Sequence, residues 1–399
     1  SSEAIRESLD PRLRGDDVVH DSTTKSTDRL GTARRVVIKI GSSLLVEPDG
    51  AGLDREWLSS LVDELSRFQA RGQQIVVVSS GAIALGRRYL GLAKNHARLE
   101  QLQAAAASGQ VLLAHAYQEL LDARGMRGAQ VLLTPEDTEN RRRFLNARGT
   151  LGRLLERSVI PVINENDTVT TEEIRYGDND RLAARVAQLV MADALILLSD
   201  VDGFYTADPG TDSTAELIPE VTTITAEMQA AAGETRSDIG SGGMATKVQA
   251  ARIATHAGCS TIIASGKVDY PLHALAATGR GTVFRAEGTP AAARKQWLAG
   301  VLEVRGELRV DQGAATALRN GKSLLPVGIV EVVGNFRRGD VVTVLTPDGL
   351  ELGRGLAEYS NADALLLCGC QSEEIEEKLG YRGRSVMIHR DEMVLFDND

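Results

Sequence analysis

The chain has few cysteines and few aromatic residues. Among its 399 residues are 3 cysteines, at positions 259, 368 and 370, and only 4% phenylalanine, tryptophan and tyrosine. Three cysteines at this spacing exclude a disulfide framework and a four-cysteine zinc site, which favours a reducing compartment, so we expect the cytoplasm. The six histidines are scattered, with neither a metal-binding spacing nor a nucleophile pair, and we expect no metal site formed by protein ligands alone.

The chain also lacks an excess of positive charge and long apolar runs. Its formal net charge is -10, which argues against a broad basic face for nucleic acid but leaves a local basic site open. No apolar run is long enough to span a membrane, and the first residues have no signal-peptide pattern. We therefore expect no membrane partner.

The length exceeds that of one typical core and predicts two domains. Residues 1–33 are polar and predict a mobile extension. Residues 34–285 alternate short β-branched runs with amphipathic stretches, which predicts an α/β three-layer sandwich with a mostly parallel central sheet. The expected strands are 36–40, 75–80, 131–133, 159–163, 194–200 and 261–265. Between the first two, Asp54 and Gly72 are expected to bound a helix.

The remainder of the chain shows a different pattern. Residues 305–388 have short strand-like runs separated by glycine-containing turns, which predicts a small, mostly β domain. A connector is expected at 286–304 and a C-terminal tail at 389–399.

A glycine-rich segment precedes a lysine at 237–247, SDIGSGGMATK. Glycines let backbone N–H groups approach an anion, and a helix beginning near Met244 would direct its positive end to the same place. Taken alone, such a run is more often an ordinary flexible loop. As a phosphate loop it would include Ser241, Gly242, Gly243, Met244, Ala245, Thr246 and Lys247.

Polar residues also follow the expected strands. Lys39 lies in the apolar run VVIKI, where a charged side chain is unfavourable unless it is paired or faces an anion, although a lysine extending from an edge strand is an alternative. Ser79, Ser80 and Gly81 end the second strand, with small side chains that suit a carboxylate or phosphate, or else a helix N-cap. Ser199 and Asp200 end a third strand.

The segment 164–181 holds two polar clusters, and a solvated acidic turn is the alternative explanation. Asp167 could bind an ammonium group, Asn179 could donate to a carboxylate, and Asp180 could pair with lysines. Carboxyl ends of parallel strands share one edge, so the sequence predicts a site there for a small zwitterionic ligand and a phosphorylated one.

Several segments resemble the glutamate 5-kinase family of the amino acid kinase superfamily. They are VVIKIGSS, SSGAIALG, RRFLNARGT, PVINENDTV, YGDND, LSDVDGFYTADP and GSGGMATKVQAA, while GNFRRGD and SLLPVGI resemble a PUA domain. The resemblance covers all but the N-terminal extension. Ser199 and Ser241 stand where threonine is usual, and both keep a hydroxyl.

The resemblance implies ATP-dependent phosphorylation of the L-glutamate side chain, the first step of proline biosynthesis, with Mg2+ on the nucleotide. It implies proline as an inhibitor, a homodimer or homotetramer, and these roles: Lys39, Lys247 and Asp180 catalytic; Ser80, Gly81, Asn164, Asp167 and Asn179 glutamate-binding; Lys39, Ser199, Asp200 and 241–247 nucleotide-binding. One alternative is another carboxylate kinase, acting on acetylglutamate or aspartate. A second is RNA binding through the PUA-like domain, with Phe336, Arg337 and Arg338 as a small contact site.

Overall fold

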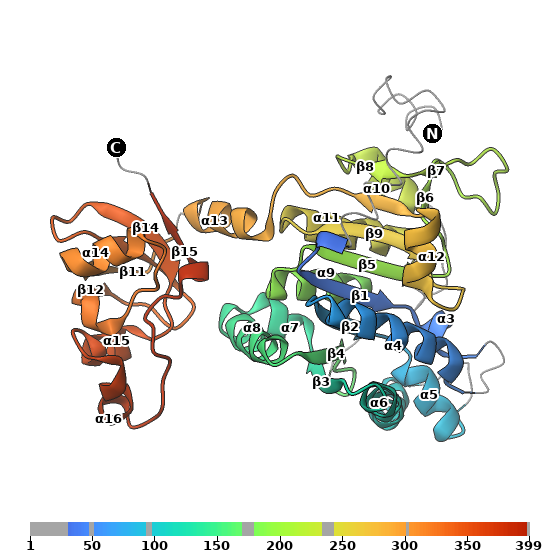
Figure 1. Cartoon of the computed structure of the whole chain (residues 1–399), viewed down its shortest axis with the longest axis horizontal. Helices are drawn as coiled ribbons and strands as arrows, with labels where there is room; N and C mark the ends of the chain where they lie inside the picture. The colour runs from blue at the N-terminus through green and yellow to red at the C-terminus, as the bar shows by residue number, and fades with distance from the viewer. Residues whose placement is uncertain are drawn as a thin grey trace. The chain divides into compact units, whose positions relative to one another are not determined.

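A computed structural model describes residues 31–47, 52–92, 98–169, 179–233, 243–300 and 303–396. The predicted extension, 1–33, lies outside these residues except for 31–33. The chain divides into two compact units between Pro290 and Ala291, and each is considered by itself (Figure 1).

The first unit is built from ten strands and ten helices within the described residues. The strands are β1 (Arg35–Ile40), β2 (Gln74–Ser79), β3 (Arg127–Leu133), β4 (Val159–Glu165), β5 (Ala194–Ser199), β6 (Phe204–Tyr205), β7 (Leu217–Ile218), β8 (Glu220–Val221), β9 (Ser260–Ser265) and β10 (Thr282–Phe284). The helices are α3 (Ser42–Leu45), α4 (Arg55–Ala70), α5 (Ala82–Tyr89), α6 (Leu99–Asp122), α7 (Pro135–Glu139), α8 (Arg141–Glu156), α9 (Asn179–Val190), α10 (Ala226–Gly233) and α11 (Met244–His256). Helix α12 (Pro271–Thr278) follows β9.

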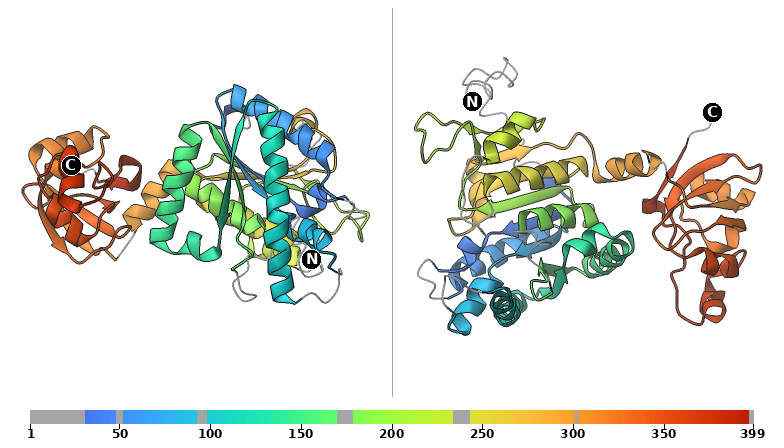
Figure 2. Two further views of the ribbon diagram at one scale, coloured as in Figure 1. Left: turned by 90° about the horizontal axis from the view of Figure 1, so that it is seen from below. Right: turned by 180° about the vertical axis from the view of Figure 1, so that it is seen from behind.

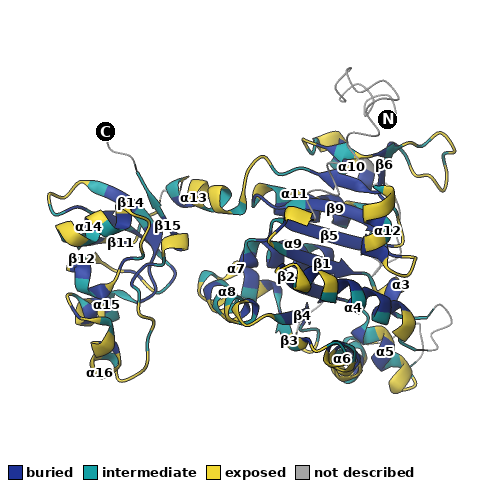
Figure 3. Ribbon diagram, in the orientation of Figure 1, coloured by how far each residue is buried: buried dark blue, intermediate teal, exposed yellow. Residues whose placement is uncertain are grey.

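Eight of these strands form one sheet in the order β3-β4-β2-β1-β5-β9-β10-β8. All neighbouring pairs are parallel except β9 with β10. Apolar side chains of α4, α5, α6 and α12 cover one face, and those of α8, α9, α10 and α11 cover the other. Helices accordingly lie on both sides of the sheet (Figure 2), and its central strands are buried (Figure 3). The predicted three-layer sandwich with a mostly parallel sheet is confirmed.

Strand β1 lies at the centre of this sheet, between β2 and β5. Side chains alternate between the two faces of a strand. Val36, Ile38 and Ile40 pack in the α4 face, and Val37 packs in the α9 face. Lys39 therefore points to the face covered by α9 and α11, one residue before the carboxyl end of the strand.

Helix α4 has the predicted boundaries. The Asp54 side chain accepts a hydrogen bond from the backbone N–H of Trp57 at 2.9 Å, which satisfies a free donor of the first turn. Gly72 has φ +81°, a conformation that favours glycine and ends the helical path. The predicted stripe is buried: Leu58, Leu61, Val62, Leu65 and Phe68.

The second unit begins with α13 (Pro290–Gly300), of which all but the first residue lies in this unit. It contains β11 (Gly306–Val310), α14 (Gln312–Arg319), η3 (Pro326–Gly328), β12 (Ile329–Gly334), β13 (Val341–Leu345), β14 (Glu351–Leu356), α15 (Asn361–Leu367), η4 (Ser372–Glu374), α16 (Ile375–Leu379), η5 (Arg390–Glu392) and β15 (Met393–Leu395). Five strands form a sheet in the order β12-β11-β13-β14-β15 around a separate apolar core.

The expected C-terminal tail is corrected by this sheet. β15 pairs with β14 over Gly353–Gly355, and Met393 is buried in the core, so the unit extends beyond residue 388. Across the described residues, no helix combines the length and the apolar composition that crossing a membrane requires.

Candidate active site

Three buried charged groups meet on the α9 face of the sheet. The ammonium nitrogen of Lys39 lies 2.5 Å from one carboxylate oxygen of Asp180, and that of Lys247 lies 3.1 Å from the other. Asp180 is in the first turn of α9, and Lys247 is in the first turn of α11. One carboxylate thus joins two lysines that are far apart in the sequence, as the sequence predicted.

The burial of this group makes its charge balance important. The side chains of Lys39, Asp180 and Lys247 are 5%, 0% and 4% exposed. Burial alone would raise the pKa of Asp180, but the charges and hydrogen bonds of the two lysines outweigh it and hold that pKa below its ordinary value. The carboxylate is therefore ionised at neutral pH, and one buried carboxylate is shared by two lysines.

The start of α11 adds hydrogen-bonding groups beside the lysines. The Thr246 hydroxyl lies 3.1 Å from Asp180 Oδ2 and 2.7 Å from the carbonyl oxygen of Gly243. Gly243 is the N-cap and has no side chain to satisfy the first N–H groups of the helix, which include those of Met244 and Ala245. Such a helix end suits phosphate. Ser241 and Gly242, predicted to bind nucleotide, lie outside the described residues.

The carboxyl end of β5 supplies the other predicted nucleotide contacts. The Ser199 hydroxyl donates to Asp200 Oδ1 at 2.9 Å, and the carbonyl of Ser199 accepts from the N–H of Gly266 at 2.7 Å. β5 neighbours β1 directly, so both residues lie at the sheet edge where Lys39 lies.

On the other side of β1, three predicted substrate residues form one hydrogen-bonded group. Nδ2 of Asn179 lies 2.7 Å from Asn164 Oδ1, 2.9 Å from the Ser80 hydroxyl and 3.1 Å from the carbonyl oxygen of Ser79. These contacts bring the ends of β2 and β4 to the first residue of α9. They also occupy the amide donors of Asn179, so its predicted donation to a carboxylate is not favoured by this geometry.

The loop before α5 is suited to hold a carboxylate. Gly81 has φ +105°, which side chains rarely adopt, and this turn directs the chain from β2 into α5. The first backbone N–H groups of α5 and the Ser80 hydroxyl are hydrogen-bond donors at the same end of β2. Asp167, expected to bind an ammonium group, is half-buried just after β4.

Sequence reasoning missed the support that α6 gives to this loop. A Cβ atom at Gly86 would overlap the carbonyl oxygen of Ala105, and one at Gly109 would overlap that of Ala82. Helices α5 and α6 therefore pack backbone against backbone. Also from α6, the buried Tyr117 hydroxyl donates to Ser79 Oγ at 3.0 Å, and burial raises the pKa of this tyrosine. The sequence signal for this packing was the run of small residues in AAAASGQ of α6.

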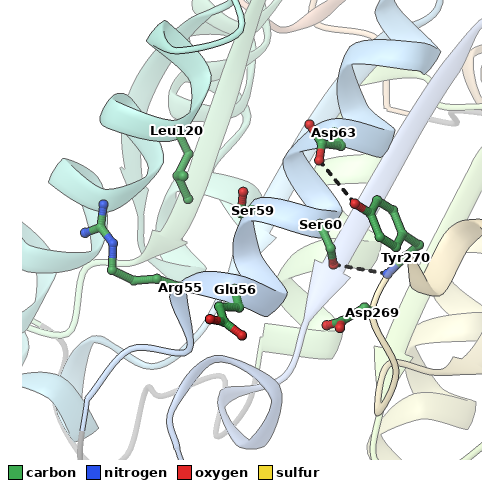
Figure 4. A pocket seen from close by; sticks show the side chains of 8 residues that line it. All are labelled: Arg55, Glu56, Ser59, Ser60, Asp63, Leu120, Asp269 and Tyr270. Atoms are coloured by element: carbon green, nitrogen blue, oxygen red, sulfur yellow. Dashed lines mark hydrogen bonds between the residues drawn. The ribbon is translucent and has the colours of Figure 1, made fainter.

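A cavity of about 410 Å³ lies beside α4, which covers the other face of the sheet from α9, and Figure 4 shows the side chains that line it. Its lining comes from α4, the end of α6 and the segment before α12: Arg55, Glu56, Ser59, Ser60, Asp63, Leu120, Asp269 and Tyr270. The Tyr270 backbone N–H donates to Ser60 Oγ at 3.0 Å, which holds that segment to α4. None of the predicted site residues lines this cavity.

Two further sequence-based expectations concern metals and RNA. Over the residues that the structure describes, no three histidine, cysteine or carboxylate side chains cluster as a metal site would require. In the second unit Phe336 is 1% exposed and packs in the core, and Arg338 pairs with the buried Glu358 at 3.4 Å. The expected contact site of Phe336 with Arg337 and Arg338 is therefore wrong, because a buried ring cannot stack on a base.

Comparison with known proteins identifies the family of this chain. The model of the amino acid kinase family matches residues 34–265, and that of the PUA domain matches residues 306–379. The chain belongs to the amino acid kinase family. Within this family it is 53% identical to the glutamate 5-kinase of Ruegeria sp. (strain TM1040) over 366 residues, 92% of this chain and 99% of that one. It is 51% identical to the glutamate 5-kinase of Bradyrhizobium diazoefficiens over 370 residues, 93% of this chain and 99% of that one.

These relatives place the chain among the glutamate 5-kinases of the amino acid kinase family, as its motifs indicated, and make it a kinase. Among the solved structures to which the chain is similar is carbamate kinase from Giardia lamblia bound to AMP-PNP, at 16% identity and TM-score 0.47, covering 64% of this chain and 99% of that one. UMP kinase from Ureaplasma parvum has 14% identity and TM-score 0.43, covering 63% and 98%.

Proposed function

We propose that this amino acid kinase transfers the γ-phosphoryl group of ATP to the side-chain carboxylate of L-glutamate, giving L-glutamyl 5-phosphate. The supporting observation is the pairing of Lys39 and Lys247 with the two oxygens of Asp180. Phosphoryl transfer needs fixed positive charge where negative charge gathers on the transferred oxygens. The relatives named above are glutamate 5-kinases, which supports glutamate as the acceptor.

The proposed reaction needs no general base. A glutamate side chain has a pKa of about 4.3 and is already ionised near neutral pH. The main obstacle is repulsion between this carboxylate and the triphosphate. A lysine about 4 Å from a phosphoryl oxygen contributes on the order of 4 kcal/mol at an effective dielectric near 20, so two lysines address this obstacle directly.

The remaining residues are proposed to hold the two substrates. Ser80, Gly81 and the start of α5 would bind the α-carboxylate, with Asn164, Asp167 and Asn179 nearby. Ser199, Asp200 and the segment 241–247 would bind the nucleotide, with Lys39 reaching its terminal phosphate. Mg2+ prefers oxygen ligands and usually keeps phosphates and waters in its shell, so we place it on the nucleotide.

The biological setting is part of the same proposal. The reaction would be the first step of proline biosynthesis and would take place in the cytoplasm. The three free thiols support this location. Proline, a smaller zwitterion, would inhibit at or beside the glutamate site. Assembly as a homodimer or homotetramer is supported by Val111 and Leu112 of α6, 68% and 40% exposed, and by β3, which is an edge strand of the sheet within the described residues.

Trapping of the acyl phosphate tests the proposal. The protein is incubated with ATP, Mg2+, hydroxylamine and, in separate samples, glutamate, N-acetylglutamate or aspartate. Hydroxamate formed with a clear preference for glutamate is the expected result. Preference for either of the other acids would show that the chain is a different carboxylate kinase. Retention of structured RNA at physiological salt is measured in parallel, and tight, salt-sensitive binding would revive the RNA alternative.

A further inference from the structure

The substrate side of the site contains a chain of three amide side chains that ends on α6. Gln110 Oε1 accepts from Asn164 Nδ2 at 2.8 Å, and Asn164 Oδ1 accepts from Asn179 Nδ2 at 2.7 Å. Gln110, Asn164 and Asn179 are 7%, 4% and 6% exposed. Their polar groups depend on one another, because a buried amide without a partner is unfavourable.

Two backbone groups fix the orientation of the amide side chains in this hydrogen-bonded series. The N–H of Glu165 can only donate, and it lies 2.9 Å from Asn164, so the atom that faces it must be Oδ1. The carbonyl of Ser79 can only accept, and it lies 3.1 Å from Asn179, so the atom that faces it must be Nδ2. With both asparagines fixed in this way, Asn164 turns its NH2 group to Gln110, whose partner atom must be an acceptor.

The fixed direction determines what Asn179 offers to a ligand. Its Nδ2 faces three protein acceptors, and within the described part of the chain its Oδ1 receives no hydrogen bond. The Ser80 hydroxyl, 2.9 Å from that Nδ2, keeps its own proton to donate. A donor and an acceptor side by side match the carboxylate and ammonium groups on one α-carbon.

We infer that Gln110 is a positioning residue for the acceptor substrate: it holds the Asn164 amide, and through it Asn179, so that Asn179 presents Oδ1 to the substrate's ammonium group. This inference rests on the proposed function and concerns the same site. α6 can hold the amides in this orientation because Gly109, the residue before Gln110, packs directly on α5. α5 begins just after Ser80 and Gly81.

The experiment compares three variants by steady-state kinetics. Gln110→Met keeps the approximate volume but removes the acceptor, whereas Gln110→Glu keeps an acceptor oxygen. Gln118→Met is the matched control, because Gln118 is an exposed residue of the same helix that donates to Asp122. We expect Gln110→Met to raise the KM for glutamate about tenfold, which is the typical size of a hydrogen bond to a charged group. Its kcat should change less than threefold and its KM for ATP less than twofold.

The other variants define the interpretation. Gln110→Glu should keep the glutamate KM within threefold of the unaltered protein, and Gln118→Met should leave it unchanged. A KM within twofold for Gln110→Met, or equal losses for Met and Glu, would overturn the inference. Glutarate, which lacks the ammonium group, is added as a competing inhibitor. Its inhibition constant should change less than twofold in Gln110→Met, and a rise parallel to the glutamate KM would refute the ammonium assignment.

Failure of this inference differs from failure of the proposed function. If the unaltered protein traps no glutamyl hydroxamate, the proposed function and the inference fall together. If it does, and Gln110→Met behaves like the unaltered protein, only the positioning role is lost.

Discussion

Replacing Asp180 with asparagine tests whether one buried carboxylate holds the site together. The carboxylate is fully buried, and its two oxygens pair with Lys39 and Lys247 at 2.5 and 3.1 Å. Asparagine keeps the shape but removes the carboxylate charge that pairs with both buried ammonium groups. Removing one partner of a buried ion pair costs about 3–5 kcal/mol in the free energy of unfolding.

Asp202→Asn is the matched control for this loss of unfolding free energy. Asp202 pairs with Arg280 at the same distance, 2.5 Å, but these side chains are 28% and 62% exposed. Exposed pairs contribute about 0–1 kcal/mol, so Asp202→Asn should change stability little. We expect the melting temperature of the kinase unit to fall by about 6–20 °C for Asp180→Asn and by less than about 4 °C for the control.

The assay follows thermal unfolding by the fluorescence of Trp57, which is buried in the kinase unit. A second variant separates stability from catalysis. Lys39→Met combined with Asp180→Asn removes one of the two buried positive charges, so it should regain part of the lost stability while the phosphoryl transfer rate stays low. The reasoning is refuted if Asp180→Asn is no more destabilising than Asp202→Asn, or if the double variant is less stable than Asp180→Asn alone.

Three further outcomes are expected. Lys247→Ala should lower kcat at least a hundredfold with a smaller change in the glutamate KM, while Asp167→Ala should mainly raise that KM. Equal effects of the two variants in steady-state assays would contradict the assigned roles. Gly109→Ala should raise the glutamate KM and lower the melting temperature, because its new methyl group would overlap the carbonyl of Ala82 and displace α5. Unchanged kinetics would show that α5 does not position the substrate. The pKa of Asp180 is lower in the folded protein than its ordinary value of 3.8, so its stabilising contribution is present above that value and is lost as the pH falls through the folded pKa. The difference in unfolding free energy between the unaltered protein and Asp180→Asn should therefore shrink below about pH 4. A constant difference would exclude this ionisation as its origin.

The sequence by itself determined the kinase-type fold and its reactive edge. Near-continuous apolar runs are found only where both faces of a strand are covered, so they predicted a parallel sheet, and Asp54 and Gly72 predicted the ends of α4. A lysine inside such a run needs a nearby counter-charge, which identified Lys39 as part of a site. These features depend on local pattern and on the energetic cost of burying charge.

Only the tertiary structure decided which partners these residues have. That Asp180 uses one oxygen for each lysine, and that the donors of Asn179 are already engaged, depends on contacts between segments that are far apart in the sequence. The same holds for Gln110, Gly86 and Gly109, whose helical neighbours look like ordinary small or polar residues in sequence, and for Phe336, which looked like an RNA contact but fills a core. Sequence pattern shows the need for a partner, whereas packing across the fold selects it, because only the folded chain brings distant segments to within hydrogen-bonding distance.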